Sequence, residues 1–331
     1  MGNLKFAIIG CGAIFDSHAA AITAIKDAEL AAICDKSAEA LNIAGRRHPT
    51  ASLYEDYIKM LDETDVDIVN IVTPPSSHSK IGMEAAKRGK HVIVEKPVDI
   101  SLDAADKLIG ECRRNGVKLG CIFQNRFNES ITAAKKAIND GILGRLNFGG
   151  SYTRWWREQS YYDNRKSSGS LRADGGGALI NQSVHTIDLL LNFMGPVSEV
   201  YGYIASRAHQ DIGVEDVGAA ALLFKSGALG IIEGSTGAYP GFCTRLDING
   251  EDGTVIIEDS RIVTWKMKDG TPAPEIVESA VTPHQRQIAD FIEAVRCGGE
   301  PAVNGEEARK ALEVVLAIYE SNRTGRRVMI G

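Results

Sequence analysis

The regular alternation of short apolar runs and helical patterns through the first 123 residues is the strongest constraint on the fold. The apolar runs lie at 4–9, 30–34, 67–72, 91–94 and 117–123. Between them, apolar residues recur at helical spacing over 13–25, 38–46, 54–61, 77–88 and 102–114. Strands that are apolar at consecutive positions are typical of parallel sheets covered on both faces. Because strand–helix–strand repeats make right-handed crossovers, residues 1–123 are predicted to form a doubly wound parallel α/β domain.

The rest of the chain follows a different pattern. Helical spacing is found at 128–139, 178–194, 284–296 and 306–323, and alternating strands at 147–153, 197–205, 217–224, 229–235, 243–249 and 254–258. Turn sequences such as Asn249-Gly250 separate the strands. Residues 124–331 are therefore predicted to form an α+β domain with a large, mostly antiparallel sheet that is open on one face.

Composition excludes several classes of protein. The 331 residues carry 37 Lys and Arg against 43 Asp and Glu, so no basic excess exists to cover a nucleic-acid backbone. No run approaches the roughly 20 apolar residues of a membrane span. The six cysteines are scattered without a CxxC pair, which argues against structural zinc and disulfides. We expect no metal, and a cytoplasmic protein without a signal peptide.

The first strand runs into a glycine turn, Gly10-Cys11-Gly12. At such a turn, Gly10 permits the tight bend, and Gly12 lets a pyrophosphate approach the N-terminus of the next helix. The third position of the fingerprint is Phe15 instead of Gly or Ala, which predicts a local adjustment of the packing. The turn indicates a dinucleotide site, although an ordinary strand–helix turn has the same sequence features.

Asp35 ends the second strand, 23 residues after Gly12. A carboxylate there accepts hydrogen bonds from an adenosine ribose and repels a 2′-phosphate. The repulsion is on the order of 4 kcal/mol per unit charge at about 4 Å and an effective dielectric of 20. NAD is therefore predicted over NADP, with Lys36 weakening the preference. Asp35 as the N-cap of the second helix is the structural alternative.

Two further loops follow predicted strands at the sheet edge where open α/β sheets bind ligands. Thr73-Pro74-Pro75 begins the first loop and His78 ends it. Glu95-Lys96-Pro97 forms the second loop, directly after a buried run. Both are expected to face the nucleotide.

The turn GCGAIF, Asp35, TPPSSH, Glu95-Lys96-Pro97 and the later segment DGGGALINQSVHTIDLL together resemble the Gfo/Idh/MocA oxidoreductase family. This family includes glucose–fructose oxidoreductase, inositol dehydrogenase and rhizopine-catabolism enzymes. The resemblance spans essentially the whole chain. It implies a Rossmann domain with NAD, a C-terminal sheet that makes subunit contacts, and a homodimer or homotetramer. It also implies that Lys96 and His185 lie at the reaction centre.

The resemblance also implies a set of cofactor and substrate contacts. Besides the residues already named, we expect cofactor contacts from Ala13, Ile14, Glu95, Lys96, Gln124, Trp156 and Arg157. Substrate contacts are expected from Lys96, Arg126, Tyr162, Arg172, Asn181 and His185, with residues 154–173 as a long loop that covers the substrate.

The helix predicted at 178–194 carries a polar stripe. Asn181, His185 and Asp188 are spaced to share one helix face. Many family members have Asp four residues before the histidine, where this chain has Asn181, so a proton-transferring carboxylate is missing. The structural alternative is that His185 is a buried histidine whose ring nitrogens form hydrogen bonds with neighbouring groups.

Oxidation of an alcohol removes a hydride and a proton, and the protein must accept the proton. A histidine with an unperturbed pKa near 6.5 suits that role. We therefore expect His185 as general base and Lys96 as the stabiliser of the developing alkoxide, although the two roles can be exchanged or shared. Asn181 would orient substrate or His185, and Asp188 would fix the imidazole tautomer.

Asn181-Gln182 before the histidine, with Trp155-Trp156-Arg157 and Tyr161-Tyr162-Asp163 upstream, is similar to UDP-N-acetylglucosaminuronate 3-dehydrogenases. The expected activity is NAD-dependent oxidation of a pyranoside ring hydroxyl to a ketone, at C3 of such a uronate in its sharper form. Alternatives are an inositol or free-sugar dehydrogenase, and a non-catalytic NAD-binding regulator. The sequence leaves open the sugar, the hydroxyl, the direction and the oligomer.

Overall fold

The computed structural model describes residues 2–167, 170–277 and 279–331. The chain forms two compact units. The first consists of the residues up to Gln124 together with Ser279–Arg309, and the second of Asn125–Glu278 together with Lys310–Gly331. The first boundary lies next to the predicted one. The sequence prediction placed all residues after 123 in the second domain, whereas Ser279–Arg309 belongs to the first unit.

The first unit contains a parallel sheet of six strands in the order β3-β2-β1-β4-β5-β6. Its strands are β1 Leu4–Ile9, β2 Ala28–Cys34, β3 Ser52–Tyr54, β4 Ile68–Ile71, β5 His91–Val94 and β6 Leu119–Cys121. The order reverses between β1 and β4, which is where doubly wound sheets bind dinucleotides. The predicted Rossmann sheet is confirmed. The exposed edge strand β3 was not predicted, because its three residues show no apolar run.

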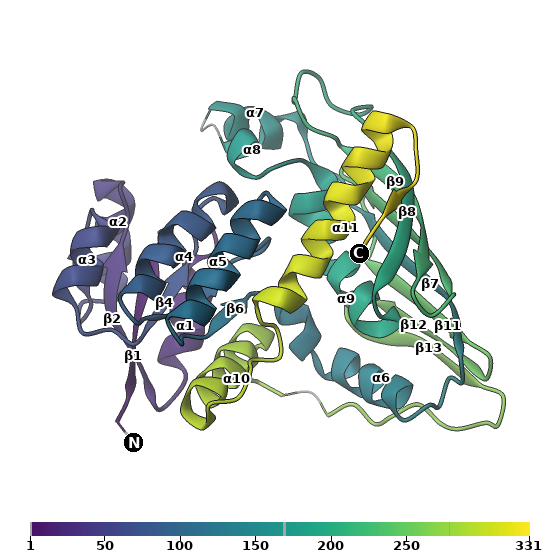
Figure 1. Ribbon diagram of the computed structural model, residues 1–331, viewed down its shortest axis with the longest axis horizontal. Helices are drawn as coiled ribbons and strands as arrows, with labels where there is room; N and C mark the ends of the chain where they lie inside the picture. The colour runs from purple at the N-terminus through teal and green to yellow at the C-terminus, as the bar shows by residue number, and fades with distance from the viewer. Residues whose placement is uncertain (1, 168–169, 278) are drawn as a thin grey trace. The chain divides into compact units, whose positions relative to one another are not determined.

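Helices cover both faces of this sheet (Figure 1). They are α1 Phe15–Thr23, α2 Ala38–Arg47, α3 Tyr57–Glu63, α4 His78–Lys87, α5 Leu102–Arg114 and α10 Pro283–Cys297, with short 3₁₀ turns η1 Pro75–Ser77 and η2 Gln124–Phe127. The contacts α3–α4 and α4–α5 form one layer, and α1 contacts α10. Ser37, Asp56, Ser101 and Thr282 cap their helices by accepting backbone N–H bonds.

Helix α10 belongs to the first unit because of what it buries. Ile288, Phe291 and Ile292 join the hydrophobic cluster that includes Phe15 of α1. The Gln287 amide donates to the Cys121 carbonyl over 2.7 Å and accepts from the Phe123 N–H over 3.1 Å. A buried side chain of this size contributes about 1.5–3 kcal/mol, so these contacts fix α10 against the strands of this unit.

The second unit contains a sheet of eight strands in the order β13-β12-β11-β7-β10-β9-β8-β14. The strands are β7 Leu146–Arg154, β8 Val197–Ala205, β9 Val217–Phe224, β10 Leu229–Ser235, β11 Arg245–Gly250, β12 Gly253–Glu258, β13 Arg261–Met267 and β14 Val328–Met329. All neighbours are antiparallel except β10 and β7. The predicted mostly antiparallel sheet is confirmed, and β13 and β14 extend it at both edges.

The helical elements that this unit contains or shares are α6 Glu129–Asn139, α7 Gln159–Ser167, α8 Ser170–Ala173, the π-helical turn η3 Ala178–Ser183, α9 Val184–Met194 and α11 Gly305–Thr324, within which the unit boundary lies. The turn η3 contacts β7, β9 and β10, α9 contacts β7 and β11, and α6 contacts β13. A Cβ at Gly149 of β7 would lie 2.7 Å from Met194 and 2.8 Å from Leu190, so glycine permits the close approach of α9. Tyr203, Leu229 and Val263 are more than half exposed.

The segment predicted as a long covering loop has a different structure. Within residues 154–173 lie the helices α7 and α8. The segment has few apolar residues, so helical periodicity was not visible. Tyr162 and Leu171 are nevertheless buried and pack together with Ile212. In the part of the chain that the structure describes, no helix is long and apolar enough to cross a membrane.

Candidate active site

The glycine turn after β1 is built for close approach of backbones. Gly10 has a φ of 108°, and a Cβ there would lie 2.7 Å from the Val72 carbonyl oxygen. A side chain is therefore excluded at Gly10. At Gly12 a Cβ would meet nothing within 4 Å, and Gly12 and Ala13 are exposed, with Ile14 half-buried. This open turn at the start of α1 suits a dinucleotide pyrophosphate.

Phe15, the departure from the glycine fingerprint, is 3% exposed and packs in the core of the first unit. Its ring meets that of His48 edge-on at a centroid distance of 5.8 Å. The adjustment predicted at this position therefore takes the form of an additional apolar contact at the start of α1.

Asp35 organises the glycine turn. Its carboxylate accepts the Cys11 N–H over 2.6 Å and the Ser37 N–H over 2.7 Å. The N-cap of α2 is Ser37, whose hydroxyl accepts the Ala40 N–H. The alternative of Asp35 as a simple helix cap is therefore wrong. Asp35 is half-buried and Lys36 is exposed beside it.

The loop after β4 is held by its own polar side chains. The Thr73 and Ser77 hydroxyls lie 2.7 Å apart, and Ser77 donates to the Pro74 carbonyl. Pro74 is exposed and Pro75 half-buried. Thr73, Pro74 and Pro75 therefore present a stiff surface at the carboxyl end of β4.

His78 has a structural place in this loop. Its ring is fully buried, with Nε2 2.8 Å from the Thr73 carbonyl oxygen and Nδ1 3.0 Å from that of Pro97. Burial lowers the pKa of His78 despite these two acceptors. The ring joins the two loops and leaves no surface for a nucleotide, which differs from the predicted cofactor contact.

The loop after β5 carries Glu95 and Lys96. Glu95 is 9% exposed, and its Oε1 lies 2.9 Å from Nε2 of the fully buried His18. Lys96 is half-buried. Gln124, at the end of the unit, has a buried Oε1 without a hydrogen-bond partner in the described residues. The carboxyl ends of β1, β2, β4 and β5 thus bring Gly10, Asp35, Thr73 and Glu95 to one edge of the sheet.

In the second unit, the glycine run before the π turn fits tightly around Glu215. A Cβ at Gly177 would lie 1.8 Å from the Glu215 carbonyl oxygen. The Glu215 carboxylate accepts the Gly177 N–H over 2.8 Å, the Leu179 N–H over 2.9 Å and the Tyr319 hydroxyl over 2.8 Å. Burial raises the pKa of Glu215 in spite of these donors. This carboxylate holds the start of the helix that carries Asn181 and His185.

The π turn places Asn181 and Gln182 in separate polar contacts. The Asn181 amide donates to Asp174 over 3.0 Å, and Asp174 also pairs with Arg165. The Gln182 amide donates to the Tyr161 hydroxyl over 2.8 Å. π turns add a residue to a helical turn and are frequent at functional sites. Asn181 therefore lies before the α-helical part of the segment, and His185 lies within its first turn.

Asp188 and Arg126 form a buried ion pair. The Arg126 Nε and Nη2 each donate to one Asp188 oxygen over 2.7 Å. The Arg126 side chain is 10% exposed and the Asp188 side chain is 1% exposed. Two Arg126 donors are thus occupied by Asp188. The predicted role of Asp188 in fixing the His185 tautomer and the predicted substrate contact of Arg126 remain predictions.

The remaining predicted residues lie around α7. Trp156 is 37% exposed and contacts the Tyr239 ring edge-on, and the Arg157 guanidinium stacks on Trp155 and Tyr161. Tyr162 is 2% exposed and bonds Thr236 through its hydroxyl, which argues against a direct substrate contact. Burial raises the pKa of Tyr162 to about 12. The side chain of Arg172 lies outside those that the structure describes.

Sequence reasoning missed four residues that organise these sites. They are His18, Asp174, Glu215 and His284. Asp174 stands beside the glycine run, so its position was a usable signal. The partners of the other three lie far away in the sequence, and no local pattern reveals them.

The parallel sheet order, the open glycine turn and Asp35 define a dinucleotide-binding oxidoreductase fold. Residues 4–123 match the model of the oxidoreductase family with an NAD-binding Rossmann fold, GFO/IDH/MocA. Residues 131–256 match the GFO/IDH/MocA C-terminal domain. The chain belongs to this family.

Similar proteins of known activity or structure cover the whole chain. Myo-inositol 2-dehydrogenase of Thermotoga maritima is 27% identical over 99% of this chain and 98% of its own. The WlbA dehydrogenase of Bordetella pertussis, crystallised with NADH and UDP-GlcNAcA, is 33% identical over 99% of both chains, with a TM-score of 0.92. The WlbA dehydrogenase of Chromobacterium violaceum, with the same two ligands, is 31% identical over 100% of this chain and 97% of its own, also with a TM-score of 0.92.

The chain is therefore an NAD-dependent dehydrogenase of the sugar and polyol class. Its glycine turn, Asp35 and the stiff loop from Thr73 provide groups suited to NAD. The alternative of a non-catalytic regulator is not supported, because the relatives are named dehydrogenases.

Proposed function

We propose that this enzyme oxidises the C3 hydroxyl of a UDP-N-acetylhexosaminuronate to a ketone. The observation that carries the proposal is the similarity to two dehydrogenases crystallised with NADH and UDP-GlcNAcA, over essentially the full chain and at 31–33% identity. The residues Asn181-Gln182 before His185, and Trp155-Trp156-Arg157 upstream, add support.

The cofactor supplies the hydride acceptor, so the protein has to accept one proton from the substrate hydroxyl. His185 is the proposed general base, and Lys96 is the proposed donor of a hydrogen bond to the developing alkoxide. A cation beside the alkoxide stabilises charge that is absent from the alcohol, and it therefore lowers the barrier. The exchanged assignment, with Lys96 as base, makes a different prediction for the pH profile, given in the Discussion.

The other residues of the proposal bind and orient. Asn181, anchored by Asp174, is the proposed amide contact to the sugar. Trp156 and Arg157 are proposed contacts to the cofactor. The buried pair of Arg126 and Asp188 supports the helix that carries His185. Each assignment rests on family resemblance together with the placements above.

A substrate screen tests this proposal. Formation of NADH is followed at 340 nm with UDP-N-acetylglucosaminuronate, UDP-glucuronate, UDP-N-acetylglucosamine, inositols and free aldoses. We expect the highest kcat/KM with the acetamido uronate, and at least about tenfold less when either the acetamido group or the carboxylate is absent. Turnover of inositols without turnover of UDP-uronates would overturn the proposal.

An inositol dehydrogenase is the second candidate. Inositol 2-dehydrogenases from three bacteria are 26–28% identical over 99% of this chain. An inositol presents ring hydroxyls and carries no nucleotide, so an inositol dehydrogenase would turn over its substrate without any UDP group. The same screen separates the two candidates.

We also propose that the protein is a cytoplasmic homo-oligomer, a dimer or tetramer, assembled through the open face of its large sheet. Tyr203 of β8, Leu229 of β10 and Val263 of β13 are 61%, 57% and 52% exposed. Exposed apolar side chains on several strands of one sheet are typical of a protein interface. Light scattering coupled to gel filtration measures the assembly, and a monomer at micromolar concentration would contradict it.

A further inference from the structure

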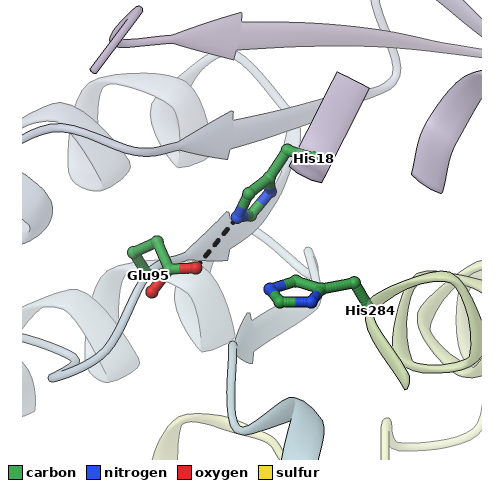
Figure 2. Close-up of side chains that lie close together, drawn as sticks. All are labelled: His18, Glu95 and His284. Carbon is green, nitrogen blue, oxygen red and sulfur yellow. Dashed lines mark hydrogen bonds and ion pairs between the residues drawn. The ribbon is translucent and has the colours of Figure 1, made fainter. Parts of the chain in front are cut away.

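Three ionisable side chains converge inside the first unit, next to the loop that carries Lys96. They are His18 of α1, Glu95 after β5 and His284 of α10 (Figure 2). One ring nitrogen or carboxylate oxygen of each lies within 4.8 Å of the others. These three residues are far apart in the sequence. His18 and His284 come together because α1 and α10 pack on each other.

His18 stands in the middle of a continuous hydrogen-bonded chain. The side-chain amide of Asn70 in β4 lies 3.1 Å from His18 Nδ1. On the other side of the ring, Nε2 lies 2.9 Å from Glu95 Oε1, and it donates to this oxygen because a carboxylate only accepts hydrogen bonds. The second oxygen, Oε2, accepts the backbone N–H of Lys96 over 3.0 Å. The chain therefore runs from Asn70 through two side chains to the backbone of Lys96.

Burial makes this chain costly to break. His18 and Asn70 are fully buried, and Glu95 is 9% exposed. Removal of one partner would leave a buried donor or carboxylate unsatisfied, which is destabilising. Hydrogen bonds to a carboxylate are also stronger than neutral ones. The Glu95 side chain is thus confined to one orientation.

From this geometry we propose that His18 is a positioning residue for Lys96, acting through Glu95. The Lys96 N–H is held by the carboxylate, and this fixes the peptide plane from which the lysine side chain departs. His18 lies on α1, the helix that begins at the glycine turn. The kinetic part of this proposal rests on the proposed role of Lys96.

His284 closes the cluster from α10. Its ring points toward the His18–Glu95 pair (Figure 2), and its buried Nε2 has no hydrogen-bond partner in the described residues. Burial and the neighbouring His18 lower its pKa, and Glu95 opposes the shift. His284 therefore packs beside the His18–Glu95 pair as an uncharged ring, and it is not part of the hydrogen-bonded chain.

The same three side chains form a His–His–Glu set, which is also a zinc ligand set. The hydrogen-bond pattern favours the hydrogen-bonded chain from Asn70 to Lys96 over a zinc site. His18 Nε2 donates to Glu95 in this structure, whereas a metal would need the lone pair of that nitrogen. Zinc binding is accordingly an outcome that the experiment has to distinguish.

The direct test measures amide exchange at Lys96 by hydrogen–deuterium exchange and mass spectrometry on the full-length protein. His18→Leu should speed exchange at Lys96 by about tenfold or more, since a lost hydrogen bond of about 1.4 kcal/mol corresponds to tenfold. His18→Gln, which retains an amide donor, should restore most of the protection. His91→Gln, in the same unit at the far end of β5, is the matched control. Unchanged exchange at Lys96 in His18→Leu would overturn the proposal whatever the substrate is.

Kinetics provide the functional half of the test. His18→Leu should lower kcat on the order of 10- to 100-fold, because a small misplacement of a catalytic group costs that much, with the NAD dissociation constant within about threefold. His18→Gln should recover kcat. If His18→Leu does not fold, Glu95→Gln breaks the same chain without altering α1. In the double variant the two losses should not add, because both act through one loop. Additive losses, or an equal fall in NAD affinity, would indicate a general structural role and contradict the proposal.

Zinc titration of metal-free protein completes the experiment. We expect no stoichiometric binding that depends on the cluster. One zinc ion per chain, lost in both His18→Leu and His284→Ala, would identify a metal site and overturn the hydrogen-bonded assignment.

Discussion

Among individual residues, Asp35 combines one observed contact with one proposed contact. Its carboxylate holds the glycine turn through the Cys11 N–H, and we propose that it also recognises the adenosine ribose of the cofactor. On this proposal, Asp35 selects between NAD and NADP.

Replacement of Asp35 by serine should reduce the preference for NAD over NADP. The repulsion of a 2′-phosphate, on the order of 4 kcal/mol per unit charge, is then removed. We expect the ratio of kcat/KM values to fall by about 100-fold, measured with both cofactors. Asp16→Ser, an exposed acid of α1 paired with Arg47, is the control. An unchanged ratio in Asp35→Ser would show that another group selects the cofactor.

The identity of the proton acceptor, His185 or Lys96, can also be tested with single substitutions. If His185 is the base, His185→Asn should lower kcat by about 100- to 10,000-fold and abolish the acid limb of the pH–rate profile. Lys96→Met should lower kcat but retain that limb. The opposite pattern would assign the base to Lys96, and near wild-type turnover of His185→Asn across pH would remove the histidine from the mechanism.

Among the structural elements, the π turn before α9 is the most informative. The Glu215 carboxylate accepts two N–H groups at its start, and Gly177 is packed directly against the Glu215 carbonyl. A helix start with buried donors needs such an acceptor. The position of Asn181 therefore depends on a residue of another part of the second unit.

Gly177→Ala should disturb this element. The added Cβ would lie 1.8 Å from the Glu215 carbonyl oxygen, so the turn or the strand end has to shift. We expect a loss of stability of about 1–3 kcal/mol and a lower kcat. Gly110→Ala, in α5 with nothing within 4 Å, should instead leave activity unchanged and stabilise the protein by up to about 1 kcal/mol. Equal urea midpoints for Gly177→Ala and wild type would contradict the tight packing.

The elements that the sequence predicts are those with strong local periodicity. The consecutive apolar runs identify five of the parallel strands, and Glu95-Lys96-Pro97 directly follows one of them. β3 and α7 were missed because an exposed edge strand and a charged helix have no apolar pattern. A π turn cannot be read from spacing alone, so the face shared by Asn181 and His185 was only approximate.

On the scale of the whole chain, the division into units depends on long-range contacts that periodicity does not contain. The sequence pattern identifies α10 as a helix but gives no reason to place it in the first unit. That placement depends on Gln287 and its bonds to the end of β6, and on apolar contacts to α1. Chain order was therefore a poor guide to the unit that residues 279–309 join.

Acid sensitivity is a property of the whole first unit. Burial lowers the pKa of His78, His91 and His284. Because the unfolded chain binds protons near an ordinary pKa of 6.5 and the folded unit does not, stability is complete above that pH and falls as the pH drops toward the lowered values. Urea unfolding should thus show a lower midpoint at pH 5.5 than at pH 7.5.

His91→Gln tests the origin of this effect. His91 accepts the Lys118 N–H through Nδ1, and glutamine offers a non-titrating acceptor. The fall in stability between the two pH values should be smaller in the variant, by up to about 1.4 kcal/mol per unit of pKa shift. An identical fall would mean that His91 does not contribute.

The most direct test of the account follows the hydride itself. UDP-N-acetylglucosaminuronate carrying deuterium at C3 is mixed with NAD and the enzyme, and the NADH is analysed by mass spectrometry. The account predicts one deuterium in each NADH formed, together with a 3-keto product and a slower single turnover than with the unlabelled sugar. Formation of unlabelled NADH, or none at all from this substrate, would contradict it.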